Sequence, residues 1–572
     1  MRLQVSKTKN AASFYVVKSI YNKGIRTSRI VEKLGTEESL RKKLDGRDPY
    51  EWAEKYVKEL TRLEKEGKEP EVITKHSPSK QIDKDVKRSF NGGYLFLQQI
   101  YHELGLHKIC NEISKKHKFT FDLDSILSRL LYGRIIFPAS KLATNELAAQ
   151  FIEPPNFELQ HIYRALEIIT TESDFIQASL YQNSLKISKR NTSILYYDCT
   201  NYFFEIEQEE GLKQYGKSKE NRPSPIVQMG LFMDSDGIPL AFNITNGNTN
   251  EQITLKPLEE KILSDFQLSK FVVCTDAGLA SNSNRKFNDK AGRAFITTQS
   301  IKKLKDNLKK WALDPKGWHL PETLEEYDLT KIHETKHKDK VFYKERWINE
   351  NQLEQKLIVT YSIKYKEYQR TIRNGQIERA KKAVESGASK LKKRSPNDPK
   401  RFIAELHCTP EGELAEKHLY NIDYDMVAKE ESFDGFYAVC TNLEDDASEI
   451  TKINHRRWEI EECFRIMKSE FKARPVYLQR DDRIKAHFTT CFIALIIYRF
   501  LEKKLDGKFT CSEIISGLRN MNFYEIPGDG FIPTYTRTDF TDALHEAFGF
   551  RTDYEIVTKK QMKEIFKATK TK

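Results

Sequence analysis

The sequence lacks the cysteine patterns of disulfide-linked and zinc-binding proteins. Its eight cysteines are scattered over 572 residues and form no Cys-x-x-Cys pair, and no histidine lies beside them at the spacing of a zinc ligand. Small secreted domains use paired cysteines, whereas structural disulfides are rare in the reducing cytoplasm. The cysteine pattern therefore favours a cytoplasmic protein.

Long apolar segments are also lacking. The first ten residues contain no apolar core of a signal peptide, so we expect no export. The longest apolar run, from Phe488 to Phe500, spans 13 residues and contains Arg499, whereas a helix needs about 20 apolar residues to cross a bilayer. The run predicts a buried helix, and we expect no membrane partner.

Acidic residues are in deficit. The chain has 95 Lys and Arg against 83 Asp and Glu, a net charge of +12. This balance favours a polyanionic partner, although charge alone does not separate nucleic acid from an anionic membrane surface. From Lys364 to Arg401 there are 13 basic and four acidic residues. That segment is a candidate DNA or RNA contact surface or, equally, a solvated helix and loop.

The length predicts several domains, because a single core rarely exceeds about 300 residues. Two β-rich runs at 12–20 and 25–34 predict a hairpin, residues 37–67 a charged helix, and 93–189 a helical region broken by prolines. The helical region suits DNA binding or simple packing. The expected division is 1–84 hairpin and helix module with linker, 85–190 helical domain, 191–301 and 433–508 catalytic core, 302–432 basic insertion, and 509–572 C-terminal region.

Asp198 lies inside a near-continuous β run from Ser193 to Glu205. Because an unpaired buried carboxylate costs several kcal/mol, Asp198 should be hydrogen-bonded, metal-bound or at an open strand end. A hairpin at 226–245 and a helix at 250–266 follow, and then an apolar strand that ends on Asp276. A crossover helix returns this strand parallel to the first, so the two aspartates can lie on neighbouring strands.

The order strand, strand, strand, helix, strand is that of a ribonuclease H-like core. Residues 293–298 and 435–441 predict two further strands, on either side of the insertion. We therefore predict an α/β fold with a ribonuclease H-like catalytic core. It would carry a large insertion before a helix that contains Glu461, and a mainly helical N-terminal region would precede it.

The stretch from Asn454 to Lys472 predicts one helix, with no glycine or proline to interrupt it. Its apolar stripe at i, i+4, i+7 and i+11 consists of Ile460, Phe464, Met467 and Phe471. A charged stripe beside it places one carboxylate between cations: Arg457, Glu461, Arg465 and Lys468. The carboxylate can hold a divalent metal while the cations meet phosphodiester oxygens. The alternative is a solvated helix with i, i+4 ion pairs.

At these residues the chain resembles the DDE transposases of bacterial insertion sequences, in the insertion sequence four-like group whose signature is Tyr-x2-Arg-x3-Glu-x6-Lys. Arg457, Glu461 and Lys468 match its last three positions, and Asn454 stands where the signature has Tyr. The sequences Tyr-Tyr-Asp-Cys-Thr at 196–200 and Cys-Thr-Asp-Ala-Gly at 274–278 are similar to the two aspartate blocks of the family. The resemblance covers roughly residues 190–500.

The resemblance implies a metal-dependent DNA transposase. Asp198 and Asp276 would together hold one Mg²⁺, and Glu461 would complete the site of a second, with Mn²⁺ able to substitute. Water would cut a strand at the end of the element, and the freed 3′-OH would then join the element to target DNA.

The resemblance also implies partners and contacts. The chain would bind double-stranded DNA, both element ends and target, and a homodimer would pair two ends. Arg457, Lys468 and Arg465 would contact DNA phosphates, although Lys468 and Arg465 could instead be ion-pair partners of neighbouring glutamates. In the insertion, Trp318 or Trp347 would stack on an extruded base or, alternatively, pack in a core.

The sequence leaves two rival functions open. One is a catalytically silent, transposase-derived DNA-binding protein, which the intact set of three acids disfavours. The other is a ribonuclease H-like nuclease that cuts DNA without joining it, which the large N-terminal region and insertion disfavour only by analogy.

Overall fold

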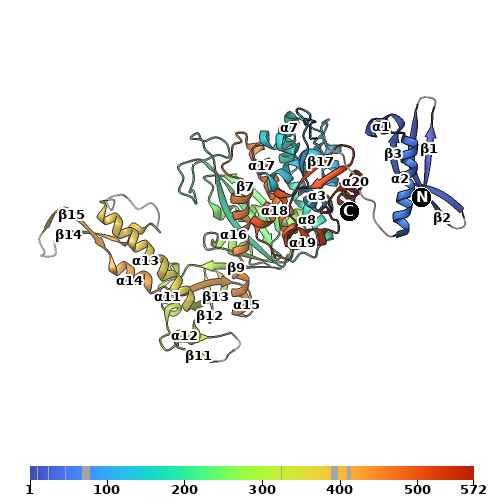
Figure 1. The fold of residues 1–572 in the computed structure, drawn as a ribbon. Helices are drawn as coiled ribbons and strands as arrows, with labels where there is room; N and C mark the ends of the chain where they lie inside the picture. The colour runs from blue at the N-terminus through green and yellow to red at the C-terminus, as the bar shows by residue number, and fades with distance from the viewer. Residues whose placement is uncertain are drawn as a thin grey trace. The chain divides into compact units, whose positions relative to one another are not determined.

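The larger compact unit of the computed structural model is built on a mixed sheet of ten strands, some of which are labelled in Figure 1. The order across this sheet is β11-β10-β12-β13-β16-β9-β8-β5-β6-β7, with the bounds of each strand given below. The structure describes residues 1–8, 11–22, 25–44, 47–66, 72, 78–290, 292–321, 323, 325–387, 397–408 and 414–571. The chain divides into two units, one of residues 1–87 and 526–531 and one of residues 88–525 and 532–572.

The first unit is a three-stranded antiparallel sheet with two helices. Its elements are β1 Arg2–Lys7, β2 Ala12–Asn22, β3 Ile25–Thr36, α1 Glu37–Lys43 and α2 Pro49–Glu66. The predicted hairpin is β2 and β3, and its turn residues Lys23 and Gly24 lie outside the described residues. The predicted charged helix is two helices, because Pro49 begins a new one at the position where its missing N–H costs nothing.

The second unit begins with the predicted helical region: α3 Tyr94–Glu103, α4 Leu106–Lys116, α5 Leu123–Ile136, α6 Lys141–Ala148, α7 Leu159–Thr171 and α8 Ser173–Ile187. Helices from the far end of the chain pack against it: α17 Asp481–Lys504, α18 Cys511–Asn520 and α20 Lys559–Lys570. The apolar run at 488–500 is the buried part of α17, as predicted. Of the helices in the described ranges, α17 alone is long and apolar enough to cross a membrane, and 89% of its apolar window is buried.

The strands of the core follow the predicted order. They are β5 Ile194–Phe203, β6 Ile226–Asp234, β7 Pro239–Asn246, β8 Phe271–Thr275, β9 Arg293–Gln299 and β16 Phe436–Thr441. β6 and β7 form the antiparallel hairpin, and α9 Leu255–Asp265 is the crossover helix that returns β8 parallel to β5. The predicted fifth strand is β9, which also runs parallel to β8.

Helices cover both faces of this core. On one face, Leu195, Tyr197 and Cys199 of β5 pack in an apolar cluster with residues of α8 and α9. On the other face, the Tyr202 ring lies 4.7 Å from the Phe488 ring of α17. Because side chains alternate along a strand, Asp198 belongs to this second face.

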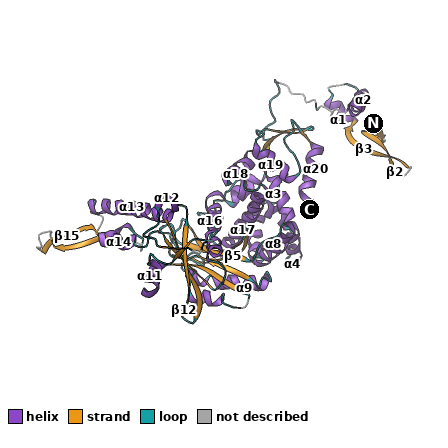
Figure 2. Cartoon of the chain, turned by 90° about the horizontal axis from the view of Figure 1, so that it is seen from below, coloured by secondary structure: helices purple, strands orange, loops and turns teal. Residues whose placement is uncertain are grey.

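The insertion has two structural parts. Its first part extends the central sheet through β10 Trp318–His319, β11 Glu326–Tyr327, β12 Val341–Glu350 and β13 Leu353–Ser362, because β13 pairs with β16. Trp318 is fully buried in this part, whereas Trp347 is 44% exposed. The second part comprises α13 Ile363–Glu385, β14 Ile403–Cys408, β15 Leu414–Ile422 and α14 Tyr424–Glu431. It extends away from the sheet (Figures 1 and 2).

Candidate active site

Asp198 and Asp276 lie level with each other on neighbouring parallel strands. The β5–β8 register pairs Tyr196 with Cys274, and each aspartate stands two residues farther along its strand or just beyond its end. Asp276 is held in the turn after β8, where its Oδ1 accepts hydrogen bonds from the backbone N–H groups of Gly278 at 2.9 Å and Leu279 at 3.1 Å. The predicted neighbourhood of the two acids is therefore present.

The environment of Asp198 opposes its charge. Burial raises the pKa of Asp198 to about 6, and the nearby Asp276 adds to the rise, while Lys219, the backbone N–H of Cys199 and Arg457 oppose it. The Cys199 N–H donates to Asp198 Oδ1 at 2.8 Å. A carboxylate that is desolvated beside a second carboxylate is typical of a functional site and suits a bound cation.

The segment at 454–472 is not the single helix that its periodicity predicts. α15 Ala447–His455 ends at Arg456, α16 Trp458–Arg465 follows a turn, and residues 466–470 form a π-helical turn. The apolar stripe is buried as predicted. At the interruption the backbone bonds span three residues instead of four, from Arg457 N–H to the Asn454 carbonyl and from Ile460 N–H to the Arg457 carbonyl. The side chains there bond to the core: the Arg456 guanidinium donates to the Ser235 carbonyl and that of Arg457 to Thr298.

Arg457 connects the sheet to the glutamate. Its guanidinium donates to Thr298 Oγ1 at 3.0 Å and lies 4.0 Å from the Glu461 carboxylate. The Arg457 side chain is 14% exposed, whereas that of Glu461 is 65% exposed. Arg457 is thus fixed against β9, while Glu461 is held only loosely.

The expected set of three metal-binding carboxylates is not assembled. No three His, Cys, Asp or Glu side chains in the described ranges lie close enough together to hold one ion. Asp198 and Asp276 come together through strand pairing, but Glu461 extends into solvent from α16. The structure therefore brings two of the three predicted acids together.

The two remaining predicted phosphate contacts diverge. Lys468 points to β5, where its ammonium donates to Thr200 Oγ1 at 2.6 Å, and burial beside Lys219 lowers its pKa to about 8. Arg465 instead donates to Glu462 at 2.7 Å and lies 3.9 Å from Glu470. Arg465 is thus an ion-pair partner of a neighbouring glutamate, which is the alternative that the sequence left open, and its acid is Glu462 rather than Glu461.

Asn454 is buried in a hydrogen-bond network between the helix and the sheet. Its amide donates to the Tyr437 hydroxyl at 2.9 Å, and that hydroxyl lies 2.7 Å from Thr298 Oγ1. Thr298 also accepts the hydrogen bond from Arg457. The residue that departs from the family signature thus supports the same threonine that positions Arg457.

Lys219 and Glu251 belong to the site but were not predicted from the sequence. Lys219 lies in the loop between β5 and β6, donates to the Cys199 carbonyl and lies 3.4 Å from Glu251. Burial opposes its charge, but Asp198 and Glu251 raise its pKa. Lys219 lies in an irregular segment, where no periodicity indicates which way a side chain points, and Glu251 begins a single 3-10 turn (Glu251–Ile253), which is too short to show a period.

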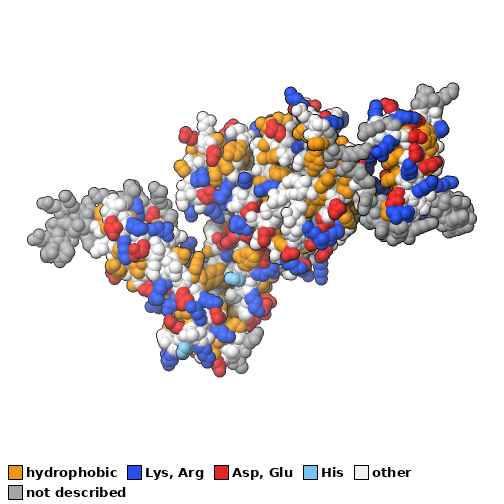
Figure 3. Space-filling model, viewed as in Figure 1, with side chains coloured by type: hydrophobic (Ala, Val, Ile, Leu, Met, Phe, Trp, Pro, Cys, Tyr) orange, Lys and Arg blue, Asp and Glu red, His pale blue; other side chains and the backbone are white. Residues whose placement is uncertain are grey.

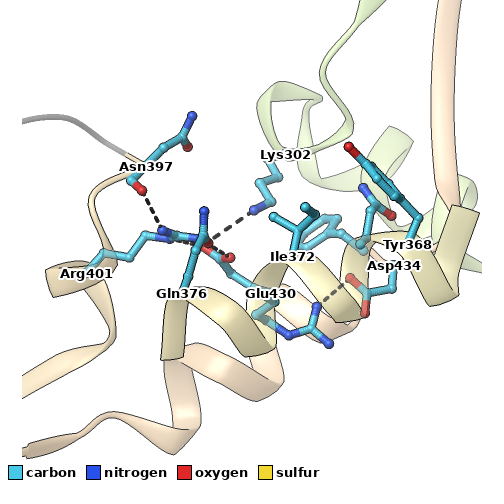
Figure 4. Close-up of a pocket in the computed structure, with 11 residues that line it drawn as sticks. Lys302, Tyr368, Ile372, Gln376, Asn397, Arg401, Glu430 and Asp434 are labelled. Atoms are coloured by element: carbon cyan, nitrogen blue, oxygen red, sulfur yellow. Dashed lines mark hydrogen bonds and ion pairs between the residues drawn. The ribbon is translucent and has the colours of Figure 1, made fainter. Parts of the chain in front are cut away.

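A pocket of about 300 Å³ lies away from the aspartates, in the second part of the insertion (Figure 4). Its lining includes residues of the basic segment 364–401, but the cations of that segment in the lining are paired with acids. Arg401 donates to Glu430 at 2.8 Å, and Arg373 lies 2.5 Å from Asp434. These pairs favour a structural role for this part of the segment, whose residues 388–396 lie outside the described ranges.

The model of the transposase DDE domain family matches residues 203–497. The match includes Asp276 and Glu461 and begins just after Asp198. A search of curated proteins finds no match.

Two solved structures show partial similarity. A piggyBac transposase in a synaptic complex with hairpin DNA is 7% identical, with a TM-score of 0.37, over 75% of this chain and 79% of that one. A Mos1 transposase in a paired-end complex with the left transposon end is 11% identical, with a TM-score of 0.13, over 41% of this chain and 63% of that one. At such scores neither carries an argument. The family match spans more than half of the sequence, and on that ground the chain belongs to the transposase DDE domain family.

Proposed function

We propose that this chain is a DDE transposase that binds the ends of a DNA element, cuts them and joins the resulting 3′-OH to target DNA. The observation that carries the proposal is the level placement of Asp198 and Asp276 on parallel strands, on the sheet face that meets the helix of Glu461. Family membership supports the reaction class. We further propose the insertion sequence four-like group, on its signature residues.

The residues present fit divalent ions. Carboxylate oxygens are the donors that Mg²⁺ and Mn²⁺ prefer, and Asp198 and Asp276 would share one ion. Glu461 is 65% exposed, with Arg457 4.0 Å away, and would contribute its carboxylate to a second ion. When bound, two such ions supply an activated oxygen nucleophile and neutralise charge on the leaving oxygen.

The chain's own cations would orient the DNA. Arg457 is fixed by Thr298 and Lys468 by Thr200, so both cations stand beside the aspartates with little freedom to move. A cation held in advance at a phosphate position costs less to order on binding than a mobile one. We propose that these two side chains hold the phosphate that is cut and its neighbour.

Double-stranded DNA is the proposed partner, at element ends and at the target. The net charge of +12 and the family support it. We also propose that two copies of the chain pair the two ends before cutting, so that the active complex is a homodimer.

The test is Mg²⁺-dependent cutting of DNA that carries the flanking ends of the chain's own gene. The intact chain should cut and then produce strand-transfer products, and Asp198→Asn and Asp276→Asn should do neither while still binding the ends. Cutting without any joined product would favour the nuclease. Binding of the ends with no cutting by the intact chain, in Mg²⁺ or Mn²⁺, would favour the silent DNA-binding protein.

A further inference from the structure

The sheet of the first unit has two different faces. Leu3 and Val5 of β1 and Phe14 and Val16 of β2 pack against the two helices in apolar clusters. The lysine at position 18 also turns to the helices, where it pairs with Glu64 of α2. Because side chains alternate along a strand, the other residues of β1 and β2 form the opposite face.

That opposite face carries side chains that donate and accept hydrogen bonds. One row crosses all three strands, because Gln4 pairs with Tyr15 and Tyr15 with Lys33. The Lys33 ammonium lies 5.9 Å from the centre of the Tyr15 ring. In the neighbouring row, Arg2 pairs with the buried Val17 and Val17 with the exposed Ile30. The Arg2 guanidinium reaches across to the following row, where it donates to Ser28 Oγ at 2.9 Å. Arg2, Gln4 and Lys33 are exposed.

The charge of the unit is segregated by layer. The first 36 residues, which include all three strands, contain eight Lys and Arg and one acid, Glu32. Residues 37–66, which include both helices, contain eight Lys and Arg and nine Asp and Glu. The strands are thus strongly basic and the helices nearly neutral. Figure 3 shows both signs of charge over this unit.

We propose that this sheet face, defined by Arg2, Gln4, Tyr15, Ser28 and Lys33, reads base edges in the major groove of the element ends. Strands lie about 4.8 Å apart, so three strands span about 10 Å, which matches a major groove about 12 Å wide. Exposed arginine, lysine and glutamine are the side chains that pair with guanine and adenine edges there.

The basic charge of the strands explains why duplex DNA is the occupant. Among its described residues this face carries two cations, Arg2 and Lys33, and no acid, because Glu32 turns to the helices and accepts a hydrogen bond from the Tyr56 hydroxyl of α2. A face of polar but uncharged side chains would suit many partners, whereas cations with no acid beside them complement the phosphates that border a groove. The inference rests on the proposed function for the identity of the DNA. It assigns the reading of that DNA to the first unit, separate from the aspartates.

The experiment measures binding of the full chain to its own flanking ends and to a scrambled duplex, in EDTA, by fluorescence anisotropy at several salt concentrations. The face variant is Arg2→Ala/Gln4→Ala/Lys33→Ala. The matched control is Lys55→Ala/Lys58→Ala, which also removes two positive charges, but from exposed positions of α2. Circular dichroism and the monomer-dimer state of each variant are checked in parallel.

Compared with the intact chain, the face variant should bind the element ends about tenfold to a hundredfold more weakly for each base contact that it loses. Its binding to the scrambled duplex should change little, so that its preference for the ends over the scrambled duplex disappears. The control should keep that preference. Equal weakening on both duplexes, unchanged binding, or a loss confined to dimerisation would each overturn the inference.

Cutting is assayed separately in Mg²⁺, so that failures can be told apart. If the intact chain cuts its ends while the face variant binds them normally, the inference fails and the proposed function stands. If the intact chain binds through this face but cuts nothing, the proposed function fails and the inference stands.

Discussion

Two glutamates two residues apart on α16 should respond to substitution in opposite ways. The Glu461 side chain is 65% exposed, and its ion pair with Arg457 spans 4.0 Å. Glu459 is 13% exposed and accepts a hydrogen bond from Arg456 at 2.9 Å. We predict that Glu461→Gln removes cutting with little effect on stability, and that Glu459→Gln lowers stability while cutting persists.

The magnitudes follow from these contacts. Two unit charges 4 Å apart in water attract by about 1 kcal/mol, and exposed pairs measure about 0.2–1 kcal/mol, so Glu461→Gln should cost less than about 1 kcal/mol. The bond to Glu459 is charge-assisted, but the Arg456 side chain is 47% exposed, so its loss should cost about 1.5 kcal/mol, at the low end for bonds to charged groups. Removing one group that stabilises a transition state typically lowers the rate by about a hundredfold or more.

The assay is urea denaturation of both variants without metal, together with Mg²⁺-dependent cutting of the ends at 25 °C. Each variant is the control of the other, because both replace one carboxylate by an amide on the same helix. Equal losses of stability, or cutting by Glu461→Gln at the rate of the intact chain, would refute the argument that Glu461 is kept for chemistry.

Three further predictions concern the scaffold around the site. Arg190→Leu should lower the free energy of unfolding by about 3–5 kcal/mol in urea denaturation, because it leaves the fully buried Asp234 carboxylate without the Arg190 Nε that lies 2.6 Å from it. A loss below about 1 kcal/mol would contradict this reasoning. Burial raises the pKa of Glu259 from 4.5 to about 7. Its protonated form therefore contributes stability that is fully present below about pH 4.5 and is lost as pH rises through about 7. Glu259→Gln should flatten the resulting fall in melting temperature between about pH 5 and pH 8, and an unchanged slope would refute this assignment. Gly247→Ala would place a Cβ 2.1 Å from the Ile226 carbonyl oxygen and 2.3 Å from that of Gln214, in the loop that carries Lys219. Cutting by this variant should drop at least about tenfold. In the control Gly375→Ala the new Cβ meets nothing within 4 Å, so cutting should stay unchanged.

The core could be predicted because its signals are local. The hairpin of β6 and β7, the crossover helix and the apolar strand before Asp276 each show in a short window of sequence. Because a crossover helix connects parallel strands of one sheet, the order of these elements places the two acids at neighbouring parallel strands. The buried helix at 488–500 was predicted in the same way, from its apolar composition.

The rest of the site depends on contacts that no short window contains. The Arg457 guanidinium donates to Thr298, which lies 159 residues earlier in the chain. Arg465 has acids on several sides of its helix, and only the folded structure shows that Glu462 is its partner. Lys219 lies in a loop, where side-chain direction follows from the backbone path and not from a period. The pairing of β13 with β16, which joins the insertion to the sheet, is likewise long-range.

The π-helical turn at 466–470 makes the helix tolerant of a change in length. In such a turn the Phe471 N–H bonds to the Ile466 carbonyl, five residues back, so the turn holds one residue more than an α-helix. Deleting one residue there would restore ordinary helical winding and leave the apolar core nearly intact. Lys468 lies inside the turn and donates to Thr200. A deletion before it would rotate its side chain by about 100°, as each helical residue advances by that angle, whereas a deletion after it would leave the bond to Thr200 in place. The position of the missing residue would therefore decide whether a homologous chain that is one residue shorter keeps its lysine on β5.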